Sequence, residues 1–298
     1  EYDRKKAQFS LLSAGVPGSV AGFHHALINY GTLSWQEVIQ PSIELAEKGF
    51  LIPHDLANTL ASKRYRERLS SDPAASKVFY KDDGSLYSAG ELLIQKDLAL
   101  TLKQISEQGP DAFYKGKIAK LIVREMEKNG GLITLDDLEN YNIVERDPVV
   151  GTYKDFKIVS MPPSSSGGTH LIQMLNMLEE FPIKDMGFGS SDSIHIMVEV
   201  MKRAYADRSK YLGDSDFYKV PSSLTNKDYA NALNKDISRE VITPSSEVSS
   251  VNPYPFESPD TTHFSVMDAY GNAVSNTYTL NFSYGSGKMI PGTGMLIN

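Results

Sequence analysis

Residues 259–268 read PDTTHFSVMD, and this stretch decides how we interpret the rest of the chain. A polar segment broken by prolines precedes it, and two runs of β-forming residues follow it. A hydroxyl residue between a tether and a strand suits a chain that cuts itself. The Thr261 hydroxyl can attack the carbonyl of Asp260, and cleavage then frees an α-amine on Thr261 that can act as base for its own hydroxyl. The alternative is a plain loop-to-strand junction, because Asp-Thr-Thr is a common string.

The residues that follow the junction predict a β-hairpin. Residues 262–267 form the first strand, residues 268–272 the turn, and residues 273–281 the partner strand. Side chains alternate along a strand, so Thr279 and Asn281 are expected to share one strand face. A hairpin can place that face beside the start of the first strand, next to the junction.

Five motifs along the chain together resemble those of the gamma-glutamyltranspeptidases. They comprise the processing junction of that family and two glycine segments of its large subunit: DTTHFSV (260–266), GNAV (271–274), TYTLN (277–281), GVPGSVAG (15–22) and MPPSSSGG (161–168). Ser164 stands where a third proline is usual in the family. The resemblance covers most of residues 13–298.

The resemblance implies roles for four residues. Thr261 would be the nucleophile, both for self-cleavage of the bond between Asp260 and Thr261 and for attack on the γ-amide of a glutamyl donor. Thr279 would hydrogen-bond the nucleophile and hold its hydroxyl in place. Asn281 would bind the polar head of the glutamyl group.

The fold that the resemblance implies is of the α+β class. It is the αββα sandwich of the N-terminal nucleophile hydrolases, here incomplete. Residues 1–260 would be a portion of the large subunit, mostly helical with strands near 143–161, and residues 261–298 the start of the nucleophile subunit. The family also uses an Arg upstream of this stretch and, downstream of it, a Ser pair, an acidic residue and a Gly-Gly turn that stabilises the oxyanion. We therefore expect the sequence to be a fragment that lacks much of the active site.

The implied activity is gamma-glutamyl transfer or hydrolysis of glutathione and related compounds. The partners would be a gamma-glutamyl donor, an amino acid or peptide acceptor or water, and two subunits cut from one precursor; no cofactor is expected. A related acylase or a poly-gamma-glutamate depolymerase on the same scaffold is an alternative. Another is an inactive remnant that keeps the fold for binding a partner.

Composition excludes several other classes of protein. Hydrophobic residues at 41% and charged residues at 22% are typical of a soluble globular chain. A net charge of −7 gives no basic footprint for nucleic acid. The absence of cysteine excludes disulfides, thiolate catalysis and cysteine-bound zinc. No apolar run is long enough for a membrane span, and the opening EYDRKK shows no signal peptide. The resemblance implies a periplasmic or secreted enzyme, whose targeting segment would lie outside this sequence.

Other chemistries find little support in the sequence. Only His24 and His25 lie close together among the histidines, and neighbours on a helix point about 100° apart, so no metal site is expected. GSGK at 285–288 lacks the glycine that a phosphate loop requires, since Phe282 holds that position. No Gly-x-Ser-x-Gly elbow occurs. His263 should project to the other side of its strand from its neighbour Thr262, and we do not assign it as a base.

Two helical signals stand out in the first half of the chain. Ser34, with Glu37 three residues later, predicts a capping box for a helix that stops at Gly49. Residues 54–70 predict a polar helix. Its basic side chains are expected to form a solvated face: Lys63, Arg64, Arg66 and Arg68.

The pattern changes to strands in the second half. Residues 143–153 and 156–161 alternate and are rich in Val and Ile, which is typical of β-strands. The turn at 164–168 then leads into a helix, where it could either bind an anion or allow tight packing. The apolar face expected for that helix consists of Leu171, Met174, Leu175 and Leu178.

Overall fold

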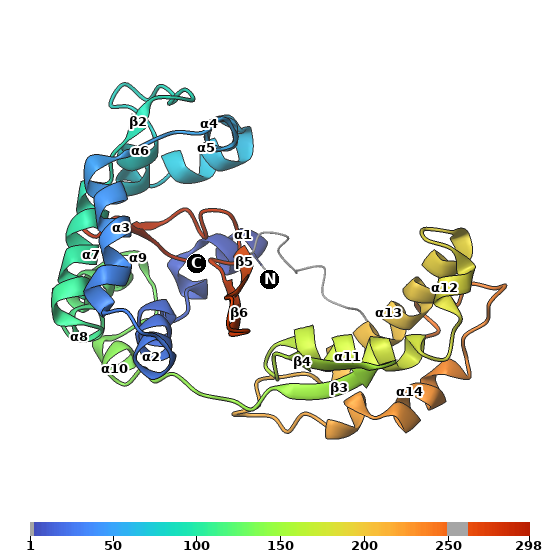
Figure 1. Ribbon diagram of the computed structural model, residues 1–298. Helices are drawn as coiled ribbons and strands as arrows, with labels where there is room; N and C mark the ends of the chain where they lie inside the picture. The colour runs from blue at the N-terminus through green and yellow to red at the C-terminus, as the bar shows by residue number, and fades with distance from the viewer. Residues whose placement is uncertain (1–2, 249–261) are drawn as a thin grey trace. The chain divides into compact units, whose positions relative to one another are not determined.

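The computed structural model describes residues 3–248 and 262–298. The chain forms two compact units. Unit 1 comprises the residues up to Ile143 together with the described C-terminal residues 262–298, and unit 2 comprises the described residues 144–248 (Figure 1). None of the helices within the described residues is both long and apolar enough to cross a membrane.

Unit 1 is mainly helical. Its helices are α1 (Arg4–Phe9), η1 (Leu11–Ser13), α2 (Ser19–Tyr30), α3 (Trp35–Lys48), α4 (His54–Ala61), α5 (Lys63–Ser70), α6 (Pro73–Phe79), α7 (Lys96–Gln108), α8 (Asp111–Tyr114), α9 (Lys117–Asn129) and α10 (Leu135–Glu139). Its strands form three antiparallel pairs: β1 (Phe50–Leu51) with β2 (Leu92–Leu93), β5 (Thr262–Met267) with β6 (Ala273–Tyr278), and β7 (Met289–Ile290) with β8 (Met295–Leu296).

Unit 2 packs helices on one small sheet. Its elements are β3 (Val149–Tyr153), β4 (Phe156–Ser160), α11 (Ser166–Leu178), α12 (Ile183–Met186), α13 (Ser191–Tyr211), η2 (Ser222–Thr225) and α14 (Lys227–Asn234). Strands β3 and β4 pair antiparallel, and α11 contacts β3, α13 and α14. The strands predicted near 143–161 are present, although the first begins only at Val149.

Helix α3 confirms the capping signals read from the sequence. The Ser34 hydroxyl accepts a hydrogen bond from the Glu37 N–H, and the Glu37 carboxylate accepts one from the Ser34 N–H. Gly49 ends the helix with φ at +83°, a conformation that costs glycine little.

The core of unit 1 includes the end of the chain. Residues 282–298, which we call the C-terminal segment, return to the helices of this unit, and β7 contacts both α6 and α9 (Figure 1). The main core gathers buried side chains from helices and from this segment: Leu11, Ile39, Ile43, Ile105, Phe113, Ile118, Ile122, Met126, Ile133, Leu138, Ile290 and Ile297. The segment is therefore fixed by apolar burial against α-helices.

The prediction of one solvated helix over residues 54–70 is wrong in two respects. Ser62 adopts an extended conformation and divides the stretch into α4 and α5. Lys63, Arg64 and Arg66 are exposed, as expected, but Arg68 is partly buried against residues more than 200 positions further along the chain.

Two glycines allow α11 to pack closely on the sheet of unit 2. A Cβ at Gly168, in the first turn of α11, would lie 2.1 Å from the Met161 carbonyl oxygen, and one at Gly151 of β3 would lie 2.5 Å from the Ile172 side chain. These approaches favour the packing interpretation of the turn at 164–168 over anion binding.

The apolar face predicted for α11 is wrong in part. Leu171 is exposed, whereas the buried positions include polar side chains: His170, Gln173 and Asn176. Polar groups of α13 and of the chain around α14 satisfy several of them, a feature that the hydrophobic pattern could not indicate.

Candidate active site

The structure describes two of the four residues that the sequence assigns to the site. Asp260 and Thr261 lie outside the described residues. Thr262 begins β5 and pairs with Tyr278 at the open end of the hairpin. Thr279 and Asn281 follow directly after β6.

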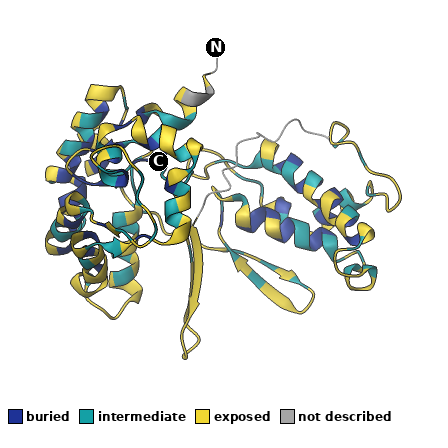
Figure 2. Ribbon diagram, turned by 90° about the horizontal axis from the view of Figure 1, so that it is seen from above, coloured by how far each residue is buried: buried dark blue, intermediate teal, exposed yellow. Residues whose placement is uncertain are grey.

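The hairpin confirms the predicted first strand and turn. Strand β5 spans the predicted residues 262–267, and Gly271 in the turn has φ at +85°. Every residue of both strands is exposed except Asn276, which is partly buried (Figure 2). One face is polar, with His263 Nδ1 2.7 Å from Thr277 Oγ1.

The prediction that Thr279 and Asn281 share a strand face is wrong. Strand β6 ends at Tyr278, three residues earlier than expected, and Asn281 has φ at +70°. The Asn281 N–H donates a hydrogen bond of 2.8 Å to Thr279 Oγ1. Threonine and asparagine both favour such local turns over a ladder, which is why the strand stops here. The two residues are thus coupled within one turn.

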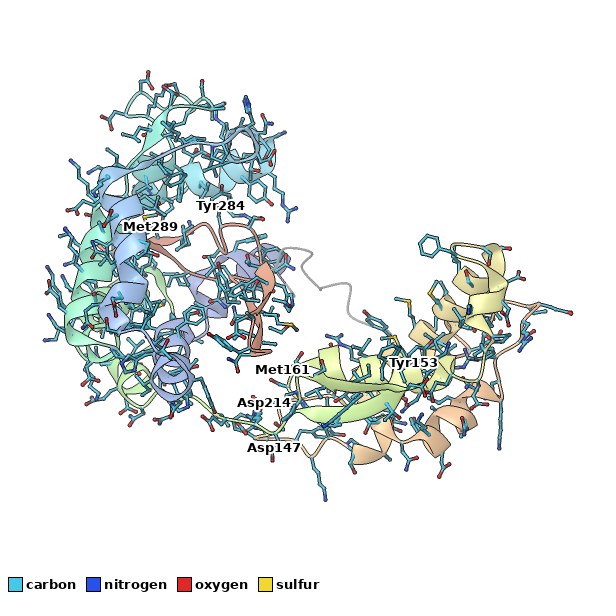
Figure 3. All side chains as sticks on the ribbon, viewed as in Figure 1. Asp147, Tyr153, Met161, Asp214, Tyr284 and Met289 are labelled. Carbon is cyan, nitrogen blue, oxygen red and sulfur yellow. The ribbon has the colours of Figure 1, made fainter. Side chains whose placement is uncertain are left out.

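The turn continues into a loop with a second unusual residue. Tyr284 has φ at +63°, which is rare for a bulky side chain. Its ring meets Tyr65 and Phe79 edge-on, with ring centroids 5.6 Å and 5.4 Å away. Tyr284 is labelled in Figure 3. Burial, followed by smaller effects of Tyr80 and Tyr65, raises the pKa of Tyr284 to about 12. Packing on α5 and α6 therefore holds this strained loop.

Arg68 of α5 contacts the same loop. Its Nη1 donates to the carbonyl oxygens of Ser283 (3.3 Å) and Gly285 (3.1 Å). Its guanidinium lies 4.0 Å from the centroid of the Phe9 ring and 5.6 Å from that of Phe282. The sequence offered no signal for this contact, because the partners are 215 and 217 residues away along the chain.

Buried polar contacts fix the rest of the C-terminal segment. The Ser286 N–H and hydroxyl both donate to the Ile297 carbonyl oxygen at 2.9 Å. Thr293 is fully buried, and its carbonyl oxygen accepts a hydrogen bond from the Thr101 hydroxyl on α7. A Cβ at Gly285 would lie 2.2 Å from the Ile297 carbonyl oxygen, so no larger residue fits without movement.

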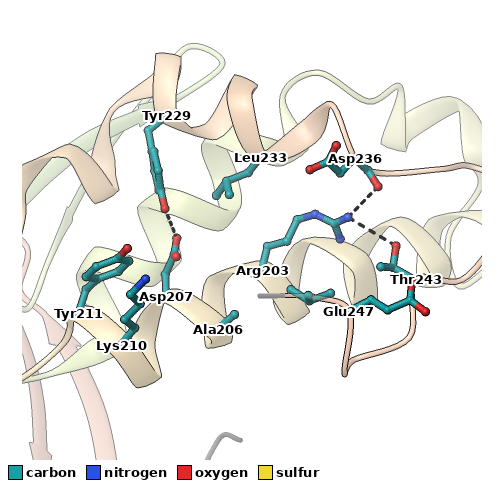
Figure 4. A pocket seen from close by; sticks show the side chains of 11 residues that line it. Arg203, Ala206, Asp207, Lys210, Tyr211, Tyr229, Leu233, Asp236, Thr243 and Glu247 are labelled. Atoms are coloured by element: carbon teal, nitrogen blue, oxygen red, sulfur yellow. Dashed lines mark hydrogen bonds between the residues drawn. The ribbon is translucent and has the colours of Figure 1, made fainter. Parts of the chain in front are cut away.

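Unit 2 contains a separate polar cavity of about 320 Å³, shown in Figure 4. Asp207 lines it and accepts hydrogen bonds from the Tyr229 hydroxyl and, more deeply, from the Gln173 side chain. Burial lowers the pKa of nearby His170, which favours its neutral form. No signal in the sequence indicates that these residues form a cavity, since they are scattered over three helices, α11, α13 and α14.

A buried charge cluster lies next to this cavity on α13. Glu199 is fully buried and receives hydrogen bonds from Lys202, Arg203 and the Thr243 N–H. Burial raises the pKa of Glu199, but these bonds outweigh it and lower the value to about 2. Arg203 also donates to the Asp236 carbonyl oxygen, as Figure 4 shows. The cluster fixes the chain at Thr243 to α13.

Neither unit offers an evident metal centre. Over residues 3–248 and 262–298, no three histidine or acidic side chains come together as a metal site would require. Of the predicted site residues, Thr261 and Thr279 carry hydroxyl groups and Asn281 an amide, and a threonine hydroxyl is a suitable nucleophile for acyl transfer.

Comparisons with known proteins agree with the motifs. The gamma-glutamyltranspeptidase family model matches residues 1–298. A "Glutathione hydrolase proenzyme" of Escherichia coli K12 is 48% identical over 99% of this chain and 51% of its own length. An "Acylase ACY 1 proenzyme" of Pseudomonas sp. SE83 is 41% identical over 96% of this chain and 50% of its own. The chain thus spans about half the length of the curated relatives it matches.

A solved structure gives the same result for the fold. The gamma-glutamyltranspeptidase of Helicobacter pylori superimposes with a TM-score of 0.81 and 46% identity, over 84% of this chain and 71% of that one. This similarity confirms the α+β class and the N-terminal nucleophile hydrolase type. Within the described residues, all sheets are two-stranded. The chain belongs to the gamma-glutamyltranspeptidase family.

Proposed function

We propose that the protein containing this chain transfers gamma-glutamyl groups from glutathione and related donors to amino acids, peptides or water. The observation that carries this proposal is the 48% identity, across 99% of this chain, to a relative named glutathione hydrolase proenzyme. The chemistry would depend on Thr261, made N-terminal by self-cleavage.

Self-cleavage begins with the hydroxyl of Thr261. Its oxygen attacks the carbonyl carbon of Asp260, the C–N bond breaks, and the acyl group moves from nitrogen to oxygen as an ester. Water then hydrolyses the ester and leaves Asp260 as a new C-terminus. The freed α-amine of Thr261 has a reference pKa of about 7.7–8.0, so near neutral pH it can accept the proton of the hydroxyl.

The Thr261 hydroxyl then reacts with the gamma-glutamyl donor. Its oxygen attacks the γ-amide carbonyl, the amine of the donor leaves with a proton, and a γ-glutamyl ester remains on Thr261. An acceptor amine or water attacks this ester and restores the free enzyme. Transfer and hydrolysis therefore differ only in the second nucleophile.

The geometry after the hairpin supports roles for Thr279 and Asn281. The last described pair of the ladder is Thr262 with Tyr278. In the sequence, Thr261 directly precedes Thr262 and Thr279 directly follows Tyr278. The hydrogen bond from the Asn281 N–H orients the Thr279 hydroxyl oxygen. We assign Thr279 to holding the nucleophile and Asn281 to binding the charged head of the donor.

The subunit arrangement and location belong to the same proposal. Residues 1–260 would be a portion of the large subunit and residues 261–298 the start of the small one, both from a single precursor. Two relatives are named proenzymes, which supports processing. We further propose a periplasmic or secreted location.

A gamma-glutamyl anilide tests the activity. The full-length, cleaved protein should release p-nitroaniline from gamma-glutamyl-p-nitroanilide, and faster when an acceptor amino acid is added. An intact, cleaved protein that releases none would contradict the proposal.

A second candidate is an acylase on the same scaffold. It is favoured by the 41% identity to a relative named acylase ACY 1 proenzyme over 96% of this chain. An acyl anilide that lacks the α-amino group separates the two, because only an acylase should prefer it to the gamma-glutamyl anilide.

A further inference from the structure

Arg68 is the one basic residue of α5 whose guanidinium hydrogen-bonds the loop after Asn281, within the described residues. We propose that Arg68 is a positioning residue for donor binding: it fixes the loop that carries Asn281 without touching the donor itself. The inference rests on the proposed function, in which Asn281 binds the head of the donor.

The Arg68 guanidinium donates hydrogen bonds to two backbone carbonyl groups of the loop after Asn281. Nη1 of Arg68 lies 3.3 Å from the Ser283 oxygen and 3.1 Å from the Gly285 oxygen. These carbonyls stand two and four residues after Asn281 in the chain. Hydrogen bonds from a charged donor are stronger than those between neutral groups, so Arg68 restricts the loop more than a neutral side chain could.

Aromatic rings hold the guanidinium in position. It lies 4.0 Å from the centroid of Phe9, and 5.6 Å from those of Tyr65 and Phe282. The rings of Phe9 and Phe282 are themselves 5.1 Å apart. A planar guanidinium can stack on rings and donate sideways at the same time, which a lysine ammonium does less well.

The loop itself is shaped to receive this arginine. A Cβ at Gly287 would lie 2.5 Å from Arg68 Cγ, so the absence of a side chain there makes room for the arginine stem. Gly287 also has φ at +76°, a value that further disfavours replacement. The backbone of the loop therefore fits the Arg68 side chain of α5, both in shape and in hydrogen bonding.

The loop needs such support because its backbone is strained. Asn281 and Tyr284 both have positive φ, at +70° and +63°. Residues in this region persist only where surrounding contacts hold them. Arg68 holds the carbonyls that flank Tyr284, so loss of Arg68 should let the loop relax and displace the Asn281 amide from its working position.

The test compares three single variants in the full-length, cleaved protein. Arg68→Ala should raise the KM for gamma-glutamyl-p-nitroanilide by about 5- to 10-fold, the effect of losing two hydrogen bonds through an intermediate loop. Its kcat should change less. Arg68→Lys should fall between wild type and Arg68→Ala. Arg66→Ala, on the exposed side of the same helix, is the matched control and should leave KM unchanged.

A double variant separates positioning from general damage. If Arg68 acts through Asn281, then adding Arg68→Ala to Asn281→Ala should raise KM no further. Independent, multiplying effects would overturn the inference, as would a wild-type KM in Arg68→Ala. If Arg68→Ala does not fold, Arg68→Lys combined with Asn281→Ala carries the same comparison.

The outcomes also separate this inference from the proposed function. A wild-type protein that is cut but inactive on the anilide, or an Asn281→Ala variant with unchanged KM, would remove the function or the role of Asn281. An Asn281→Ala variant with raised KM beside an unaffected Arg68→Ala variant would remove only the role of Arg68.

Discussion

The β5–β6 hairpin and the C-terminal segment are neighbours in the chain but are stabilised differently. The hairpin has six ladder pairs and almost no buried side chain within the described residues. The C-terminal segment has only two ladder pairs, yet Ile290 is fully buried and Thr293 bonds with α7. The hairpin is thus defined by local pattern, and the segment by contacts with helices far away in sequence.

The candidate site obtains its rigidity from the C-terminal segment and not from the hairpin. Thr279 and Asn281 lie at the boundary between the two regions. An isolated two-stranded hairpin is marginally stable at best, so it cannot fix them alone. The C-terminal segment, held by Arg68 and by the core of unit 1, supplies the fixed side of that boundary.

The largest expected effect tests this contrast through stability. Ile290→Ala removes a fully buried side chain and should lower the free energy of unfolding of this chain by about 2–5 kcal/mol. Val266→Ala on the hairpin, where the side chain is 58% exposed, should change it by about 0.5 kcal/mol or less. Urea unfolding of both variants measures the difference, and equal losses would contradict the contrast.

The next effect concerns donor binding. Asn281→Ala should raise the KM for a gamma-glutamyl donor about 10- to 100-fold in the full-length protein, because a hydrogen bond to a charged group is worth about 1.5–3 kcal/mol. Asn272→Ala in the hairpin turn is the matched control, because the Asn272 side chain and N–H donate hydrogen bonds to Asp268 of the same turn. If the KM for the donor changes in Asn272→Ala but not in Asn281→Ala, the role of Asn281 in donor binding is contradicted.

The same contrast explains what the sequence could predict. The first strand and the turn of the hairpin follow from alternation and from Gly271, which are local signals. The predicted end of β6 is three residues too late. The alternating pattern continues to Asn281, but the turn between Thr279 and Asn281 interrupts the strand after Tyr278. Arg68 was expected to be solvated, because its partners are more than 200 residues away.

Unit 2 shows a similar limit of sequence reasoning. Helix and strand positions followed from periodicity, but the buried polar face of α11 did not. His170 Nδ1 pairs with the Gln173 side chain, which in turn donates a hydrogen bond to Asp207 of another helix, so these buried polar groups depend on α13. Such a network depends on tertiary packing, which overrides the hydrophobic pattern of a single helix.

A smaller effect, on the rate of self-cleavage, is expected when the Thr279 hydroxyl is removed. Thr279→Val keeps the β-branched shape and removes the oxygen that the Asn281 N–H contacts. Self-cleavage of the full-length protein should slow by about 2- to 10-fold, in line with one hydrogen bond. Thr277→Val, which removes a hydroxyl bonded to His263 on the hairpin, should leave the rate unchanged. Unaltered processing in Thr279→Val would make Thr279 purely structural.

The smallest effect is seen only at alkaline pH. Burial raises the pKa of Tyr284 to about 12, above its ordinary value of about 10. Its neutral form therefore stabilises the fold below pH 10, and this contribution is lost as the pH rises through 12. Burial likewise raises the pKa of Tyr80, Tyr114 and Tyr229. Tyrosinate absorbance should therefore show a group of tyrosines that titrate late, and Tyr284→Phe should reduce that group by one residue. Early titration of all tyrosines would mean that the loop is open.

In the proposed mechanism, Thr261 cuts the chain before itself and then acts as the nucleophile. Intact mass measurement of the full-length protein tests this mechanism. We expect two associated chains, the smaller beginning Thr-Thr-His-Phe, and a single uncut, inactive chain for Thr261→Ala; Thr261→Ser should still cut, more slowly. Cleavage of Thr261→Ala at the same bond, or activity in uncut wild-type protein, would contradict it.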